Sequence, residues 1–252
     1  MTASLPPRPQ EGPGEYAEIT GLATEFISRM FEFERAVLSG REVEGLSLLG
    51  DNDGRLHERL DELQRRTRES VWNMQPWLNF DPYDPYDELN ARSRSVGHQV
   101  RLILPPSGLT RNPLISSKYP IVRIGPVPLP LMVIDGSVIV YEGSRAPNSN
   151  MTVWVLTRPD WVAPALAMWS AAWEVSRPAL DDPSRPPLSA RQYAVACFLA
   201  QGLGDDAIAR KVAVSRRTVA SDVRVVMDLV GAQTRFQAGT RLGSMAYTVD
   251  RS

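Results

Sequence analysis

A C-terminal stretch beginning at Leu188 decides the fold. It contains four segments with helical apolar spacing: LSARQYAVACFLAQG (188–202), DDAIARKVAV (205–214), SRRTVASDVRVVMDLVG (215–231) and TRFQAGTRL (234–242). Ser189 and Gln192 form a capping box that starts the first segment, and Gly202 is suited to end it. Ser215 is a favoured N-cap for the third segment. The stretch therefore predicts four short helices.

The third segment has two distinct faces. Its apolar face is predicted to bury Val219, Val223, Met227 and Val230. The opposite face carries Arg217, Ala220, Ser221 and Arg224. Short side chains between two arginines let a helix approach a DNA groove, while the guanidinium groups reach phosphates or guanine edges. Two helices across a tight turn, the second with such a face, predict a helix-turn-helix.

The order LS-x-R-Q…LAQG…AIA-x-x-V-x-VS-x-R-TV-x-S…G…R-x-QA resembles the LuxR-type (GerE-like) DNA-binding domain over about 50 residues. The resemblance implies that the third helix enters the major groove of double-stranded DNA and that the fourth helix forms a dimer contact. The implied DNA-binding residues are Lys211, Ser215, Arg216, Arg217, Thr218, Ala220, Ser221, Arg224 and Arg235.

Two positions depart from the family pattern. Ala220 replaces a residue that is usually basic, and Asp222 replaces one that is often His. We therefore expect a different base preference, and an affinity that depends more on Arg216, Arg217 and Arg224. The alternative for the four helices is a protein-docking module without a role in DNA binding.

The charge distribution favours DNA as the partner. Residues 188–252 carry nine Lys and Arg against five Asp and Glu, a net charge of +4. The other 187 residues carry 19 against 24, a net charge of -5. A basic C-terminal module on an acidic body is typical of a DNA-binding tail on a sensor or assembly domain.

The composition divides the chain into four parts. Residues 1–14 are rich in Pro and Gly and are predicted to be a disordered arm, and residues 15–176 an α/β regulatory domain. The Pro-rich residues 177–187 are predicted to be a linker to the helix-turn-helix domain, residues 188–252. Within the second part, a heptad seam along Tyr16–Leu38 predicts one long helix. That helix either packs on its own core or pairs with its copy in a dimer.

Period-two patterns predict an α/β fold for the second part. We expect strands over 70–74, 99–104, 120–124, 131–134, 138–141 and 152–156, and helices over 55–68 and 160–175. The segment 81–95 begins with DPYDPYDE, which indicates a loop or the start of a helix. The clearest hairpin has Asp135-Gly136 as its turn.

That hairpin resembles one motif of the phospholipase D superfamily, H-x-K-x-x-x-x-D followed by Gly and Gly-Ser. The matching residues are Asp135, Gly136, Gly143 and Ser144. The His and Lys positions hold Pro128 and Pro130, which supply neither a nucleophile nor a cation. The resemblance therefore implies a non-catalytic relative, similar to the phospholipase D-like domains of TrmB-type and LuxR-type regulators. The alternative is a generic hairpin.

The sequence thus predicts a dimeric transcriptional regulator that is not an enzyme and has no catalytic residue, metal site or cofactor. Its rival is a phosphodiesterase of the phospholipase D superfamily with a DNA-binding tail, and a third alternative is a protein-interaction scaffold. His57 and His98 lie in no catalytic or metal-binding motif. The six tryptophans indicate a packed core or a pocket for an effector, either a small molecule or a protein.

The sequence predicts neither a leader peptide nor a membrane-spanning segment. The start, MTASLPPRPQ, lacks a charged-then-apolar leader pattern. The longest apolar stretch, Trp161–Trp173, contains Pro164 and is too short to span a bilayer. We therefore expect a cytoplasmic protein.

Overall fold

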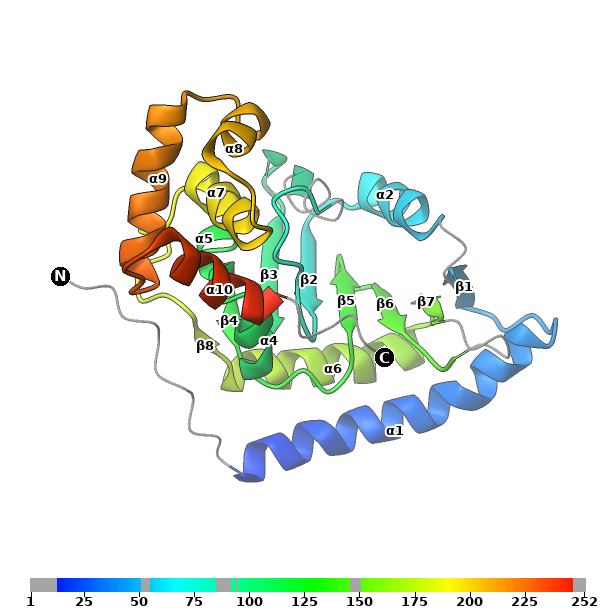
Figure 1. Cartoon of the computed structure of the whole chain (residues 1–252). Coiled ribbons are helices and arrows are strands. Elements are labelled where there is room, and N and C mark those ends of the chain that lie inside the picture. Colours follow the sequence, from blue (N-terminus) through cyan, green and yellow to red (C-terminus); the bar gives the residue numbers. More distant parts are fainter. Residues whose placement is uncertain (1–12, 51–54, 85–91, 94, 146–150, 247–252) are drawn as a thin grey trace.

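A computed structural model of the chain describes residues 13–50, 55–84, 92, 93, 95–145 and 151–246; for 13–15 and 244–246 it describes the backbone only. These residues form a mixed β-sheet with helices on both faces and a group of four helices at one side (Figure 1). Most of the predicted disordered arm, and much of the predicted 81–95 segment, lies outside the described residues.

The described residues contain one eight-stranded sheet in the order β1-β7-β6-β5-β2-β3-β4-β8. Its strands are β1 (Leu46–Gly50), β2 (Ser70–Met74), β3 (Gln99–Leu104), β4 (Arg123–Ile124), β5 (Leu131–Ile134), β6 (Val138–Glu142), β7 (Val153–Leu156) and β8 (Arg177–Pro178). The β2/β3 and β3/β4 pairs are parallel, and the other neighbouring pairs are antiparallel.

Two groups of helices accompany the sheet. Those of the α/β part are α1 (Pro13–Leu38), α2 (Leu56–Arg66), α4 (Pro106–Arg111), α5 (Ile115–Lys118) and α6 (Pro159–Val175). The four-helix group consists of α7 (Ala190–Ala200), α8 (Asp205–Lys211), α9 (Arg216–Leu229) and α10 (Arg235–Ala246). Among the helices that the structure describes, none is both long and apolar enough to cross a membrane.

The long helix α1 belongs to the core of the α/β part. It runs beside α6 along one face of the sheet (Figure 1). Ile19, Phe26 and Met30 are buried there together with Trp154 and Trp169 of the sheet and α6. Burying each large apolar side chain stabilises the fold by about 1.5–3 kcal/mol. The heptad seam is therefore a core-packing face, as the first of its two alternatives predicts.

The opposite face of the sheet is covered in two places. The amphipathic helix α2 lays Leu56, Leu60 and Leu63 over a cluster that contains Val140 and Val155. The short helices α4 and α5 cover β3 and β4, where Ile115 is fully buried. Every predicted helix in this part therefore packs against the sheet or against another helix.

The four-helix group has its own apolar core around Phe198, Ile208 and Val219. Helix α7 lies against both α9 and α10. A Cβ atom at Gly239 would lie 3.2 Å from the carbonyl oxygen of Leu199. This contact shows that α10 crosses α7 at close range.

The four-helix group is joined to the α/β part by apolar and polar contacts. Leu114 is buried in the core of the group, and the ring of Phe80 packs edge-on against Tyr193 with centroids 5.6 Å apart. The Asn112 side-chain amide donates to the Tyr193 hydroxyl at 2.9 Å. The predicted linker, residues 177–187, is joined to the sheet at its start, because Pro178 pairs with Arg123 of β4.

The predicted strands agree closely with the structure, and the differences have local causes. β4 is shorter than predicted because Tyr119–Val122 forms a turn, in which the Val122 N–H donates to the Tyr119 carbonyl at 3.0 Å. The hairpin has its turn at Asp135 and Gly136, with φ of 50° and 62°. The sequence did not predict β1 or the short helices α4 and α5.

Candidate nucleic-acid interface

Helix α9 presents a free face on the outer side of the four-helix group. We call Arg217, Ala220, Ser221 and Arg224 the groove face; all four are exposed. Val219, Val223 and Val226, on the opposite side of the helix, are buried. In Figure 1 this helix lies at the periphery, away from the sheet, so the α/β part does not cover it. The apolar periodicity of α9 therefore turns the arginines outward.

The turn before α9 caps the N-terminus of this helix with a side chain. The Ser215 hydroxyl accepts a hydrogen bond from the Thr218 N–H at 3.1 Å and lies 2.8 Å from the Thr218 hydroxyl. Ala213 has a left-handed backbone with φ of 54°, which turns the chain sharply between α8 and α9. The Val214 N–H donates to the Ala209 carbonyl at 3.1 Å. These bonds leave the remaining N–H groups at the start of α9 facing solvent.

The cations of the groove face are not neutralised within the described part of the chain. Neither Arg217 nor Arg224 forms an ion pair there. Arg216 lies 3.6 Å from Asp206, but both side chains are about 70% exposed, so water screens this pair. Three arginines at the start and along one side of α9 thus give that surface a positive potential.

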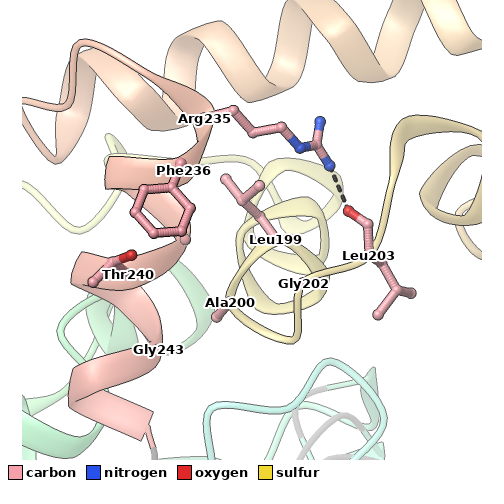
Figure 2. Close-up of a pocket in the computed structure, with 9 residues that line it drawn as sticks. Leu199, Ala200, Gly202, Leu203, Arg235, Phe236, Thr240 and Gly243 are labelled. Atoms are coloured by element: carbon pink, nitrogen blue, oxygen red, sulfur yellow. Dashed lines mark hydrogen bonds between the residues drawn. The ribbon is translucent and has the colours of Figure 1, made fainter.

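Two of the nine predicted site residues are placed differently from the rest. The Lys211 ammonium lies over the rings of Phe198 and Tyr83, 5.2 and 5.9 Å from their centroids. The Arg235 guanidinium pairs with Asp205 and donates to the Leu203 carbonyl, as Figure 2 shows for the second contact. The other seven residues lie on α9 or at its N-cap, and the structure brings them together on one surface.

Asp222 has a different role from the one that its sequence position indicates. It is buried, and it accepts hydrogen bonds from Arg191 Nε at 2.8 Å and Gln192 Nε2 at 3.3 Å. The hydrogen bond and the charge of Asp222 raise the pKa of Arg191 above its usual value. The expectation that Asp222 changes base preference is therefore corrected, because its carboxylate points toward α7. The sequence could have indicated this burial, because Asp222 lies three residues after Val219 and directly before Val223, both of which are on the buried side of α9.

The Asp of the phospholipase D-like motif binds backbone amides. The Asp135 carboxylate accepts hydrogen bonds from the N–H groups of Arg68, Glu69 and Ser70, each at 2.9 Å. Burial opposes ionisation, but these three bonds and the nearby His98 outweigh it and lower the pKa of Asp135. Asp135 therefore fixes the hairpin turn to the start of β2.

The Gly-Ser of the same motif binds a buried acid of α1. Glu34 is 3% exposed and accepts hydrogen bonds from the Tyr141 hydroxyl and the Ser144 N–H, both at 2.9 Å. Burial and the neighbouring Glu34 raise the pKa of Tyr141. A Cβ atom at Gly143 would lie 2.5 Å from Nε1 of the buried Trp154 and 2.7 Å from Glu34 Oε1, so only glycine fits. The Glu142 N–H donates to the Pro130 carbonyl, so Pro130 lies near Gly143 at the open end of the hairpin, whereas Asp135 lies in the turn at the other end.

Comparisons with known proteins yield similar folds only. No protein-family model matches the chain, and no curated protein matches it. Solved structures with a similar fold include Nuc, a phospholipase D family member from Salmonella typhimurium, at 14% identity and a TM-score of 0.43, covering 52% of this chain and 95% of that one. The archaeal chromatin protein TrmBL2, described as showing a novel mode of DNA binding, is 12% identical with a TM-score of 0.40, covering 65% and 66%. Phosphatidylserine synthase from Haemophilus influenzae is 10% identical with a TM-score of 0.39, covering 76% and 48%.

The neighbours correct one prediction. The sequence predicted that the chain is not an enzyme, whereas the similar structures include a phosphatidylserine synthase and members of the phospholipase D family. The prediction was wrong to exclude catalysis because it depended on two prolines, Pro128 and Pro130, in a single motif. Residues at one motif cannot exclude chemistry carried by side chains elsewhere in the chain. The described residues do form the predicted α/β fold with a mixed sheet, and the neighbours do not test the LuxR-type resemblance.

Proposed function

We propose that this protein is a sequence-specific transcriptional regulator of the LuxR type that inserts α9 into the major groove of DNA. The observation that carries the proposal is the groove face, in which Arg217 and Arg224 lie exposed and unpaired within the described residues while Ala220 and Ser221 keep the surface between them low. An arginine that donates two hydrogen bonds to a guanine edge discriminates against other bases by about 1–3 kcal/mol. Phosphate contacts add affinity without specificity.

The placement of the polar groups supports this orientation of α9. Ser215 and Thr218 lie at the N-terminus of the helix, where free N–H groups and the helix dipole favour a phosphate. Arg216 can exchange its exposed partner Asp206 for a phosphate because that pair is screened by water. Lys211 and Arg235 serve the packing of the group in this proposal, since their charged ends contact protein atoms.

We further propose that two copies bind DNA together, with α10 as the contact. Phe236 is 81% exposed at the start of α10. Beside it a hollow of about 650 Å³ is lined by Leu199, Leu203 and Gly239 and is largely apolar (Figure 2). Leu242, the other apolar residue expected at this contact, is fully buried in the four-helix group. The dimer contact would therefore depend on Phe236. The heptad seam of α1 would not take part, because its residues are buried in the core of the α/β part.

The α/β part would act on α9 through the junction. The Tyr83 hydroxyl donates to the Lys211 carbonyl at the end of α8 at 2.9 Å, and Asn112 holds Tyr193 of α7. A signal received by the sheet, from a small molecule or a protein, would reach the turn before α9 through these contacts. Such a regulator works where the chromosome is, so we place it in the cytoplasm.

The proposal is tested by selecting DNA from a random duplex library with the full-length protein and sequencing the retained fragments. We expect an enriched motif with two related half-sites about 34 Å apart, one turn of the duplex. Arg29→Ala, in an exposed residue of α1, serves as the matched control and should select the same motif. Retained DNA without an enriched motif would contradict sequence-specific binding, and failure to retain any DNA would favour a protein-docking module.

A further inference from the structure

Three tryptophans surround one arginine on the α6 face of the sheet. Arg101 of β3 has its guanidinium carbon 4.6 Å from the ring centroid of Trp72 and 4.9 Å from that of Trp173. Trp169 stacks on Trp72 at 4.9 Å and on Trp173 at 5.3 Å. The guanidinium plane can therefore interact with indole faces, which are the best aromatic partners for a cation.

A second arginine lies against the same cluster. The guanidinium carbon of Arg123, on β4, lies 4.6 Å from the Trp173 centroid. Its Nε donates to the Ser176 hydroxyl at 2.9 Å, and its Nη2 donates to the Ser176 carbonyl. Ser176 is the C-cap of α6, so Arg123 stabilises the negative end of this helix with part of its guanidinium. We call Trp72, Arg101, Arg123, Trp169 and Trp173 the Trp–Arg cluster.

The Trp–Arg cluster holds hydrogen-bond donors without matching acceptors. Among the described residues no carboxylate pairs with either arginine, and Arg101 has no hydrogen-bond acceptor. The indole N–H of Trp169 is also buried without a partner, although the residue is fully buried. Buried polar groups in folded proteins are nearly always paired, so the unpaired indole N–H of Trp169, whose ring centroid lies 5.9 Å from the Arg101 guanidinium carbon, indicates a missing acceptor.

Packing alone does not account for an arginine at position 101. Ile103, two residues along the same strand face, is apolar and fully buried. A guanidinium at the neighbouring position must lose part of its hydration, and the cluster gives it no anion in return. Arg101, Arg123 and Trp72 each remain partly exposed, so a ligand from solvent can reach their edges.

We propose that Arg101 and Arg123 form a binding site for a small oxyanion, a carboxylate or a phosphate, with the indoles of Trp72 and Trp173 as its apolar walls. A planar guanidinium matches both groups through paired N–H donors. Ser176 directly precedes β8, from which the chain leaves the sheet toward α7. A bound anion would therefore lie next to the connection between the two parts of the protein.

The test is isothermal titration calorimetry on the full chain with inorganic phosphate and with benzoate, at constant ionic strength. The two probes separate a phosphate site from a carboxylate site, and we expect heat of binding with at least one. Arg101→Leu should weaken the binding about tenfold or more, because charge-assisted hydrogen bonds are lost. Arg101→Lys keeps the charge and should weaken it less. Arg177→Leu, in an exposed residue of β8, is the matched control and should bind as the unmodified chain does.

Folding of the variants is checked by circular dichroism. If Arg101→Leu does not fold, Arg123→Gln replaces it, with the same expected loss of binding. The absence of heat with both anions in the unmodified chain would overturn the proposal. So would equal affinities in the unmodified chain and in a folded variant of Arg101 or Arg123. Neither result bears on DNA binding by α9, because the Trp–Arg cluster lies on the sheet and α6, outside the four-helix group.

Discussion

The carboxylate of Asp222 on α9 accepts a hydrogen bond from Nε of Arg191 on α7 at 2.8 Å, and this pair fixes the rotation of α9 about its axis. Asp222 is almost fully buried, while the Arg191 side chain is 48% exposed. Because Gln192 also donates to Asp222, one residue of α9 is bound by two neighbouring residues of α7. The direction in which the groove face points therefore depends on a contact on the opposite side of the helix.

Arg191→Ala should destabilise the protein by about 1–3 kcal/mol, because it leaves a buried carboxylate with one weak partner. The double variant Arg191→Ala with Asp222→Leu should recover part of that loss, since an apolar side chain suits the buried site better than an unpaired charge. Urea denaturation measures both values. Losses that simply add in the double variant would show that the two residues are not coupled.

Asp135 should make stability depend on pH in the acid range. Its pKa is lowered in the folded protein, so its contribution is fully present above the unfolded value of about 3.9 and is lost as pH falls through the folded value. Asp135→Asn keeps a residue that tolerates the left-handed turn and removes the charge. We expect it to be less stable at pH 7, by about 1–2 kcal/mol after allowing for partial exposure, and to differ little from the unmodified chain near pH 2.

Denaturant titrations at both pH values test this expectation. A gap in the free energy of unfolding that is as large near pH 2 as at pH 7 would contradict it. DNA affinity of the folded Asp135→Asn variant should be unchanged, because Asp135 lies in the sheet hairpin and its carboxylate binds the backbone of Arg68, Glu69 and Ser70.

The α1 helix should behave as part of the core in mutagenesis. Met30→Ala removes a fully buried side chain and should lower the free energy of unfolding by about 2–5 kcal/mol. Phe31→Ala is the matched control, because Phe31 is the next residue along α1 and is 47% exposed. Its replacement should lower the free energy of unfolding by about 0.5 kcal/mol. Deleting residues 1–40 should therefore unfold the α/β part, as measured by circular dichroism. A folded, monomeric truncation would show instead that α1 is a dimer contact.

Phe236→Ser should weaken self-association without loss of stability. The side chain is 81% exposed, so its replacement removes little packing within one copy. If α10 is the dimer contact, sedimentation velocity should show more monomer, and binding to two half-sites should lose cooperativity. Val225→Ser, a partly exposed residue of α9, is the control for a general change in surface polarity. Unaltered sedimentation and cooperativity in Phe236→Ser would place the contact elsewhere.

Local patterns predicted most of the elements but not the contacts between them. Residues 70–74 and 99–104 were predicted as strands with their observed bounds, because alternation and the flanking turn residues are local signals. The capping box of α7 and the two faces of α9 are equally local. The pairing of Arg177–Pro178 with β4 was missed, since a proline-rich segment lacks the period of a strand and its pairing depends on a distant partner.

The side chains of the candidate sites show the same division. The groove face followed from spacing within one helix, whereas Lys211 and Arg235 were selected without knowledge of Phe198 and Asp205, their partners in the fold. The Trp–Arg cluster joins residues of β2, β3, β4 and α6, and no interval in the sequence relates them. Tryptophan content alone could not show that one arginine lies among three of them.

The most direct test of the central claim is DNA binding by Arg217→Ala and Arg224→Ala, measured by fluorescence anisotropy over a series of salt concentrations. If either arginine contacts a base edge, affinity for the selected motif should fall by about 1–3 kcal/mol with a smaller loss on unrelated DNA. If it contacts phosphate only, the loss should be uniform and the salt slope should decrease by about one. Folded variants of both arginines that keep the affinity and the salt slope of the unmodified chain would contradict the claim that α9 binds DNA.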